Sequence, residues 1–90
     1  MIIFMDINEL IAIVKNKLLS QINIESIKIE DKSFLHKNHA GNQKGKFHLK
    51  IIFKSSQLKK MSRIEGNKIV YKVLDQELKD HIHSIQILIT

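Results

Sequence analysis

The segment from Phe47 to Lys54, FHLKIIFK, carries the clearest alternation of apolar and polar side chains in the chain. Its odd-numbered positions are all apolar: Phe47, Leu49, Ile51 and Phe53. Side chains alternate between the two faces of an extended strand, so these four share one face and His48 falls on the other. The pattern predicts a half-buried strand with one face in a core and the other, basic face in water. On this reading His48 is a solvated residue with no required function.

Two further segments show the same period of two. Ile27 and Ile29 alternate with charged residues, and the C-terminal segment alternates from Ile85 to Ile89. Both patterns are typical of strands, so we expect a sheet of three strands. The polar stretch Lys37–Lys46, which carries two of the three glycines, is expected to be a loop.

Helical periodicity appears on either side of these strands. A stripe of apolar residues predicts a helix from about Ile7 to Leu19, and a second stripe predicts one from about Lys68 to Lys79. We expect Gly66 to break off a shorter helical segment that covers about Leu58 to Glu65, because glycine is a poor helix former.

The resulting element order is α-β-β-α-α-β. Ninety residues suffice for one core, so we expect a single domain over residues 1–90. The fold class is α+β, a three-stranded sheet packed against helices, and the order is similar to that of a type II KH domain.

The chain has a net charge of +6 and a pI of about 9.7, which favours contact with anions. Arg63 is the only arginine, and arginine is the side chain best suited to reading guanine edges and clamping phosphates. Charge alone therefore gives little support to specific base recognition. The residues that could meet phosphates are Lys50, Lys54, Lys59, Lys60, Arg63 and Lys68.

No cysteine is present, which excludes a disulfide framework and fits a reducing compartment. The opening apolar run of five residues is too short for a signal peptide or a membrane span. We therefore expect a cytoplasmic protein that does not enter a membrane.

The five histidines are the chemically most suggestive residues. His36 and His39 form an H-x-x-H pair in the expected loop, and His81 and His83 lie where a helix gives way to a strand. Each alone is most simply an exposed polar residue. By number and residue type, the four together could form a four-histidine zinc site, although structural zinc is usually bound by cysteine thiolates.

No catalytic constellation is found. No serine lies in a G-x-S-x-G context, and the GNQKG stretch lacks the lysine and hydroxyl pattern of a phosphate-binding P-loop. The sequence therefore predicts a protein that is not an enzyme.

Four segments, in order, resemble the BolA family: EDKSFLHKNHAG, GKFHLKIIFKSS, NKIVYKVLDQEL and IHSIQI. They correspond to the family's histidine-bearing loop, its His-Phe-x-Val strand ending in serine, its Val-Tyr helix ending in Glu-Leu, and its terminal Ile-His segment. The resemblance spans about Glu30 to Ile87, and the element order read above agrees with the family's fold.

The resemblance implies a partner and a shared cofactor. BolA-like proteins bind monothiol glutaredoxins, and the pair shares a [2Fe–2S] cluster for which the glutaredoxin and its glutathione provide thiolates. His83 matches the family's C-terminal ligand and His36 its loop ligand, with His39 as a rival. Mixed cysteine and histidine ligation is an established cluster type. The expected function is an iron–sulfur cluster adaptor in trafficking or in iron, redox or stress regulation, monomeric without its partner.

Two features limit the resemblance. A perfectly regular strand would place His83 on the same face as Ile85, so we expect His83 to precede the regular ladder or to lie at a bulge. Where the family has Arg-His-Arg, this chain has Gly66, Asn67 and Lys68. Where the family has Phe-x-Gly, this chain has Leu58, Lys59 and Lys60. The surface that these positions form therefore differs from that of the family.

Two other functions stay open. The first is a nucleic-acid-binding transcriptional regulator that uses the six basic residues named above, although the KH signature G-x-x-G is missing and only Gly66 is present in that region. The second is a carrier of zinc or another metal that uses histidines alone.

Overall fold

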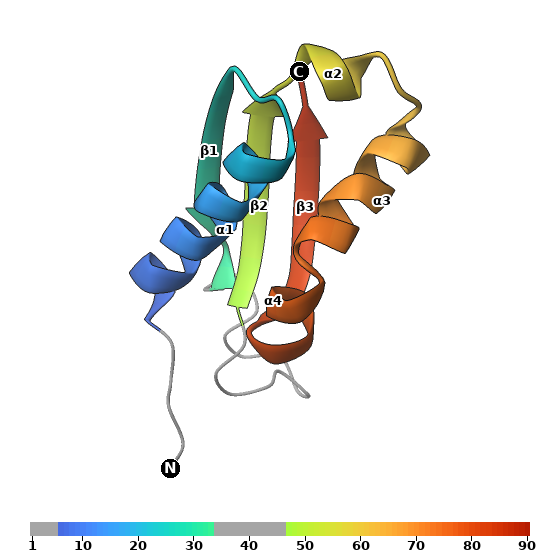
Figure 1. Ribbon diagram of the computed structural model, residues 1–90. Coiled ribbons are helices and arrows are strands. Elements are labelled where there is room, and N and C mark those ends of the chain that lie inside the picture. The colour runs from blue at the N-terminus through green and yellow to red at the C-terminus, as the bar shows by residue number, and fades with distance from the viewer. Residues whose placement is uncertain (1–5, 34–46) are drawn as a thin grey trace.

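The computed structural model describes residues 6–33 and 47–90. In that part of the chain the elements are α1 (Ile7–Gln21), β1 (Ser26–Asp31), β2 (Phe47–Lys54), α2 (Ser56–Lys59), α3 (Arg63–Val73), α4 (Asp75–Asp80) and β3 (Ile82–Ile89). The predicted α+β class and the three strands are confirmed (Figure 1). The expected loop over Lys37–Lys46 lies outside the described residues.

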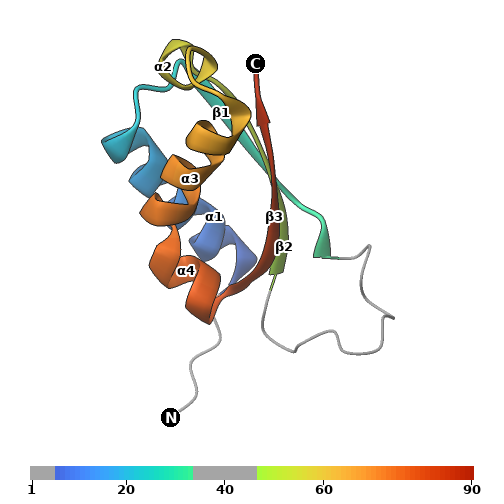
Figure 2. The ribbon, with the colours of Figure 1, turned by 90° about the vertical axis from the view of Figure 1, so that its right-hand side faces the viewer.

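The three strands form one sheet in the order β1-β2-β3. β2 is central, and it pairs antiparallel with β1 and parallel with β3. The parallel pairing requires a crossover, which α2, α3 and α4 supply between β2 and β3. Figure 2 shows the helices on one face of the sheet, and no described helix covers the other face, here called the open face.

The core lies between the helices and the inward face of the sheet. β2 contributes Leu49, Ile51 and Phe53, which are the alternating apolar positions expected from the sequence. The remaining buried apolar side chains come from the helices, the start of β3 and the turn before β1: Leu10, Val14, Leu18, Ile22, Leu58, Val70, Leu74 and Ile82. The sequence pattern therefore predicted the buried side of the sheet and of α1 correctly.

Ser55 joins β2 to α2 from a fully buried position. Its Oγ accepts a hydrogen bond from the Leu58 N–H at 3.2 Å and donates one to the Asn23 carbonyl at 2.8 Å. The first bond caps α2, because an N-cap hydroxyl satisfies an N–H that has no partner inside the helix. The second ties this helix start to the turn before β1.

Gly66 does not break a helix, so that prediction was wrong. It lies inside α3, which begins at Arg63, where the Ser62 hydroxyl caps the helix by accepting the Glu65 N–H at 3.1 Å. Gly66 is buried, and a Cβ at this position would lie 3.1 Å from the Ile89 Cδ1. The glycine lets α3 approach β3 closely, which outweighs its low helix propensity.

The single helix expected over Lys68–Lys79 is also wrong. α3 ends at Val73 and α4 begins at Asp75, with the fully buried Leu74 between them at φ −98° and ψ 17°. The chain changes direction at Leu74 while its N–H still bonds to the Val70 carbonyl. None of the helices within residues 6–33 and 47–90 is long and apolar enough to cross a bilayer.

Candidate metal centre

A bulge at the start of β3 sets the position of His83. Phe47 pairs with Ile82 and His48 pairs with Ser84, so His83 is an extra residue with no partner on β2. A bulge turns a side chain away from the face that strict alternation would give it. The expected irregularity at His83 is confirmed, and the His83 side chain is exposed instead of packing inward with Ile85.

His48 is not the solvated residue that its polar strand position predicted. Only 6% of its surface is exposed. Its Nδ1 lies 2.7 Å from the Ser84 Oγ, and its backbone N–H donates to the Ser33 Oγ at 3.0 Å. The alternation correctly predicted the face of β2 on which His48 lies. It did not predict that neighbouring residues bury the side chain on that face.

The structure brings His48 and His83 together. Their ring centroids are 4.8 Å apart and the ring planes are tilted by 53°. The buried His48 ring, held by Ser84, therefore forms one wall beside the exposed His83 ring. A neutral imidazole is a common metal ligand, and a neighbour that fixes its orientation favours coordination. Sequence reasoning missed this pairing, because it depends on the register of β2 with β3.

Hydrogen bonds tie the residues that flank the segment 34–46 to His48 on one side and to His81 on the other. On one side, the Lys32 N–H donates to the His48 carbonyl at 2.7 Å, next to the Ser33 bond. On the other side, the Phe47 N–H donates to the His81 carbonyl at 2.9 Å. His36 and His39, the predicted loop ligands, belong to this segment and lie outside the described residues.

His81 has a structural role at the end of α4. Its N–H donates to the Glu77 carbonyl at 2.8 Å, and its carbonyl accepts the hydrogen bond from the Phe47 N–H. The described residues contain no group of three or more histidine, aspartate or glutamate side chains placed to hold a metal ion. Within them, the donor set is one exposed imidazole with a second beside it. Such a set could hold a metal group whose remaining ligands come from elsewhere.

The six basic residues proposed for nucleic acid do not all line the same depression. Lys50 and Lys54 share the open-face side of β2 with His48, and Lys50 lines a shallow depression there with Lys32 and Gln86. Lys59 and Arg63 instead line a groove at the other edge of the fold. Lys60 and Lys68 are exposed and line neither place.

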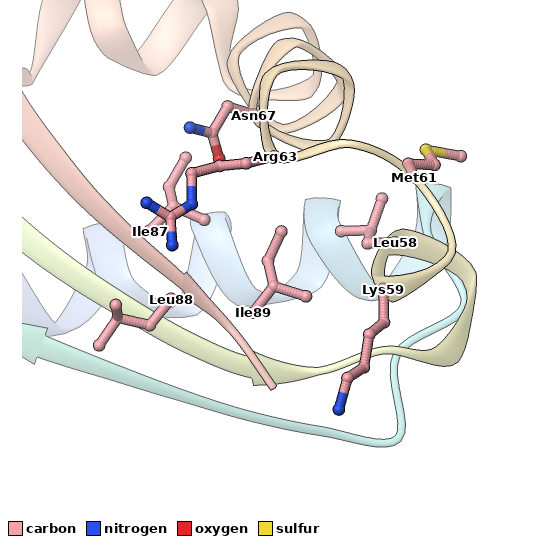
Figure 3. A pocket seen from close by; sticks show the side chains of 8 residues that line it. All are labelled: Leu58, Lys59, Met61, Arg63, Asn67, Ile87, Leu88 and Ile89. Carbon is pink, nitrogen blue, oxygen red and sulfur yellow. The ribbon is translucent and has the colours of Figure 1, made fainter.

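We call this second feature the edge groove (Figure 3). It has a volume of about 180 Å³ and lies between α2, the start of α3 and the outer edge of β3. Its lining residues are Leu58, Lys59, Met61, Arg63, Asn67, Ile87, Leu88 and Ile89.

Comparisons with known proteins agree with this architecture. A family model described as BolA-like protein matches residues 18–90. The DNA-binding transcriptional regulator BolA of Haemophilus influenzae is 25% identical over 73 residues, which cover 81% of this chain and 68% of that protein.

Solved structures give the same fold. The BolA domain of SufE1 from Arabidopsis thaliana has a TM-score of 0.75 at 23% identity and covers 88% of this chain and 87% of that one. BolA1 from the same plant has a TM-score of 0.74 at 24% identity, with the same coverage. At these identities the structural likeness concerns the fold.

Proposed function

The chain belongs to the BolA-like family, and from that premise we propose that it is a non-enzymatic iron–sulfur cluster adaptor that binds a monothiol glutaredoxin in the cytoplasm. In this proposal the two proteins share a [2Fe–2S] cluster. The glutaredoxin and its glutathione supply thiolates, and this chain, which has no cysteine, supplies imidazoles. Replacing thiolate ligands with imidazole raises the reduction potential of such a cluster.

One observation carries the proposal: the bulge that exposes His83 beside the buried His48. A bulge is a conserved type of irregularity that often re-aims a side chain at a functional site. Without it, His83 would follow the inward face of β3. Among the described residues, His83 is therefore the proposed metal ligand. The His48 ring packs against one side of the His83 ring.

The second ligand would come from His36 or His39. The number of intervening residues permits His36, which follows Ser33 by three residues. An extended chain of three residues spans at most about 11 Å, and the Ser33 Oγ is bonded to the His48 backbone. His39 is six residues from Ser33, so its reach is about twice as long.

The test mixes the protein with a cluster-loaded monothiol glutaredoxin and follows visible circular dichroism and the mass of the complex. We expect a one-to-one complex whose visible spectrum differs from that of the loaded glutaredoxin alone. His36→Ala and His39→Ala, tested singly, identify the loop ligand by which one loses the new spectrum. A complex whose spectrum is unchanged, or no complex at all, contradicts the proposal.

The name of the Haemophilus relative supports a second candidate, a DNA-binding regulator. Lys59 and Arg63 share the edge groove, but the other four basic candidates lie elsewhere. Non-specific attraction to phosphates weakens uniformly with salt, whereas specific recognition distinguishes sequences at a fixed salt concentration. Selection of a preferred duplex from a random pool at 150 mM salt would favour regulation. Equal binding to all duplexes would argue against it.

A further inference from the structure

The outer edge of β3 is open for pairing. β3 pairs with β2 on one side, and no described strand lies on its other side. The Thr90 N–H donates to the Phe53 carbonyl, which places the amide groups of Thr90 and Leu88 toward β2. Because these groups alternate along a strand, those of Ile87 and Ile89 point to the unpaired edge. An unpaired edge is a template for another extended chain.

The edge groove runs along this unpaired edge and has an apolar floor. Ile87 and Ile89 are only partly buried, although both lie on the inward face of the sheet. Leu58 of α2 lies toward Ile89, and Met61 lies farther out, beyond Leu58 (Figure 3). Small-molecule pockets are usually about 300–1,000 Å³, so a groove of about 180 Å³ suits one or two side chains of an extended chain better than a whole ligand.

The charges at the groove have one sign. Figure 3 shows Arg63 reaching from α3 over β3 and Lys59 extending from α2, with Ile89 between them. None of the eight lining residues is acidic. Carboxylates of a bound segment would therefore meet a cation at each end of the floor.

We propose that the edge groove binds an extended acidic peptide segment of a partner protein, which adds to the sheet as a strand beside β3. Its backbone pairs with Ile87 and Ile89, an aliphatic side chain packs against the apolar floor, and carboxylates of the same segment meet Lys59 and Arg63. This is peptide recognition by strand addition, in which the backbone gives affinity and the side-chain pockets give specificity.

A single-stranded nucleic acid is the competing occupant, since it too is anionic. Proteins that bind single strands stack the bases on aromatic rings. No lining residue of the edge groove is aromatic, whereas the regularly repeating N–H and carbonyl groups of the open edge match the repeat of a peptide backbone. The observations thus favour a peptide.

The proposal is independent of the metal centre. Ile87 is four residues from His83 along β3, about 13 Å at the rise of a strand. A failure at one of these places therefore leaves the other untouched.

The test uses a fluorescent eight-residue peptide that alternates glutamate and valine, with the full chain and fluorescence anisotropy at 50 mM salt. We expect saturable binding that falls about tenfold or more in the double variant Lys59→Glu/Arg63→Glu, because attractive charges become repulsive. The matched control Lys15→Glu/Lys72→Glu makes the same change of net charge at exposed positions outside the groove, and should retain most of the binding.

A second arm tests the strand pairing itself. The same peptide with every backbone amide methylated cannot pair along β3, and we expect it not to bind. In ¹⁵N spectra, the Ile87 and Ile89 amides should shift with the peptide while that of His83 does not. Equal binding of both peptides, equal loss in the two double variants, or binding of an oligothymidylate in place of the peptide would each overturn the proposal.

Discussion

Lys17 of α1 and Glu77 of α4 form an ion pair in which the Nζ and Oε2 atoms are 2.6 Å apart. The Glu77 side chain is 8% exposed, and its Oε1 has no hydrogen-bond partner among the described residues. The ion pair with Lys17 thus offsets most of the cost of burying the Glu77 carboxylate. Glu77 lies in α4, directly before the strand β3 that carries His83.

We predict that Lys17→Met lowers the free energy of unfolding by about 1–3 kcal/mol, because it leaves the buried carboxylate without its partner. Urea unfolding at pH 7 measures the change. Lys15→Met is the matched control, since Lys15 is exposed on the same helix. Equal stability of the two variants would show that the ion pair contributes nothing.

Gly66→Val should destabilise the fold by about 1–3 kcal/mol, because added methyl groups meet the Ile89 Cδ1 that a Cβ alone would approach to 3.1 Å. Gly66→Ala should lie near zero, since a gain of up to about 1 kcal/mol in helix propensity offsets the tight contact. Thermal unfolding compares both variants in the wild-type and Ile89→Ala backgrounds. A valine penalty that is unchanged by Ile89→Ala would place the clash elsewhere.

Glu25 should make stability depend on pH. Hydrogen bonds from Ser56 lower the pKa of the Glu25 carboxyl from its ordinary value of 4.5. A carboxyl whose pKa is lower in the folded state stabilises the fold above its unfolded pKa, and this stabilisation is lost as the pH falls through the folded pKa. The wild type should therefore lose stability below about pH 4.5 by more than Glu25→Gln does.

Urea midpoints at pH 7 and pH 3.5 measure this difference. Glu9→Gln serves as the control, because Glu9 is exposed and has no hydrogen bond or ion pair with any described residue. A parallel acid response in wild type and Glu25→Gln would mean that the Ser56 contact does not bias protonation.

His48→Ala should weaken the shared cluster without abolishing it. The His48 ring packs beside His83, and loss of a residue that orients a metal ligand typically costs about 10–100-fold in affinity. The decay of visible circular dichroism under chelator competition measures the loss. Ser84→Ala, which removes only the hydroxyl beside Nδ1, should have a smaller effect in the same direction. Complete loss with His48→Ala would make His48 itself a ligand.

The sequence correctly predicted the buried side of those elements whose apolar residues repeat at a regular spacing along the chain. The inward side chains of β2 and the stripe of α1 follow from periods of two and 3.6, which depend on neighbours along the chain. Gly66 was misread because its role depends on Ile89, which lies on another element. Helix propensity describes a residue within its own helix, so it cannot predict the close approach of α3 to β3 at Gly66.

The candidate metal centre was predictable in part. Parity along β3 required an irregularity if His83 was to be exposed, and the bulge lies there. The burial of His48 was not predictable, because strand alternation shows only the face on which a side chain lies, whereas its contacts with Ser84 and His83 require the pairing of β2 with β3. A polar position on a strand indicates a face, and only the assembled sheet decides whether that face is covered.

The most direct test of the central claim, that His83 offers a cluster ligand, compares His83→Ala with His81→Ala in the mixture with cluster-loaded monothiol glutaredoxin. His81 is two residues away and serves the end of α4 through its backbone, so its side chain should be dispensable. We predict that His81→Ala retains the new visible circular dichroism spectrum and that His83→Ala loses it while staying folded. An unchanged spectrum with His83→Ala would contradict the account.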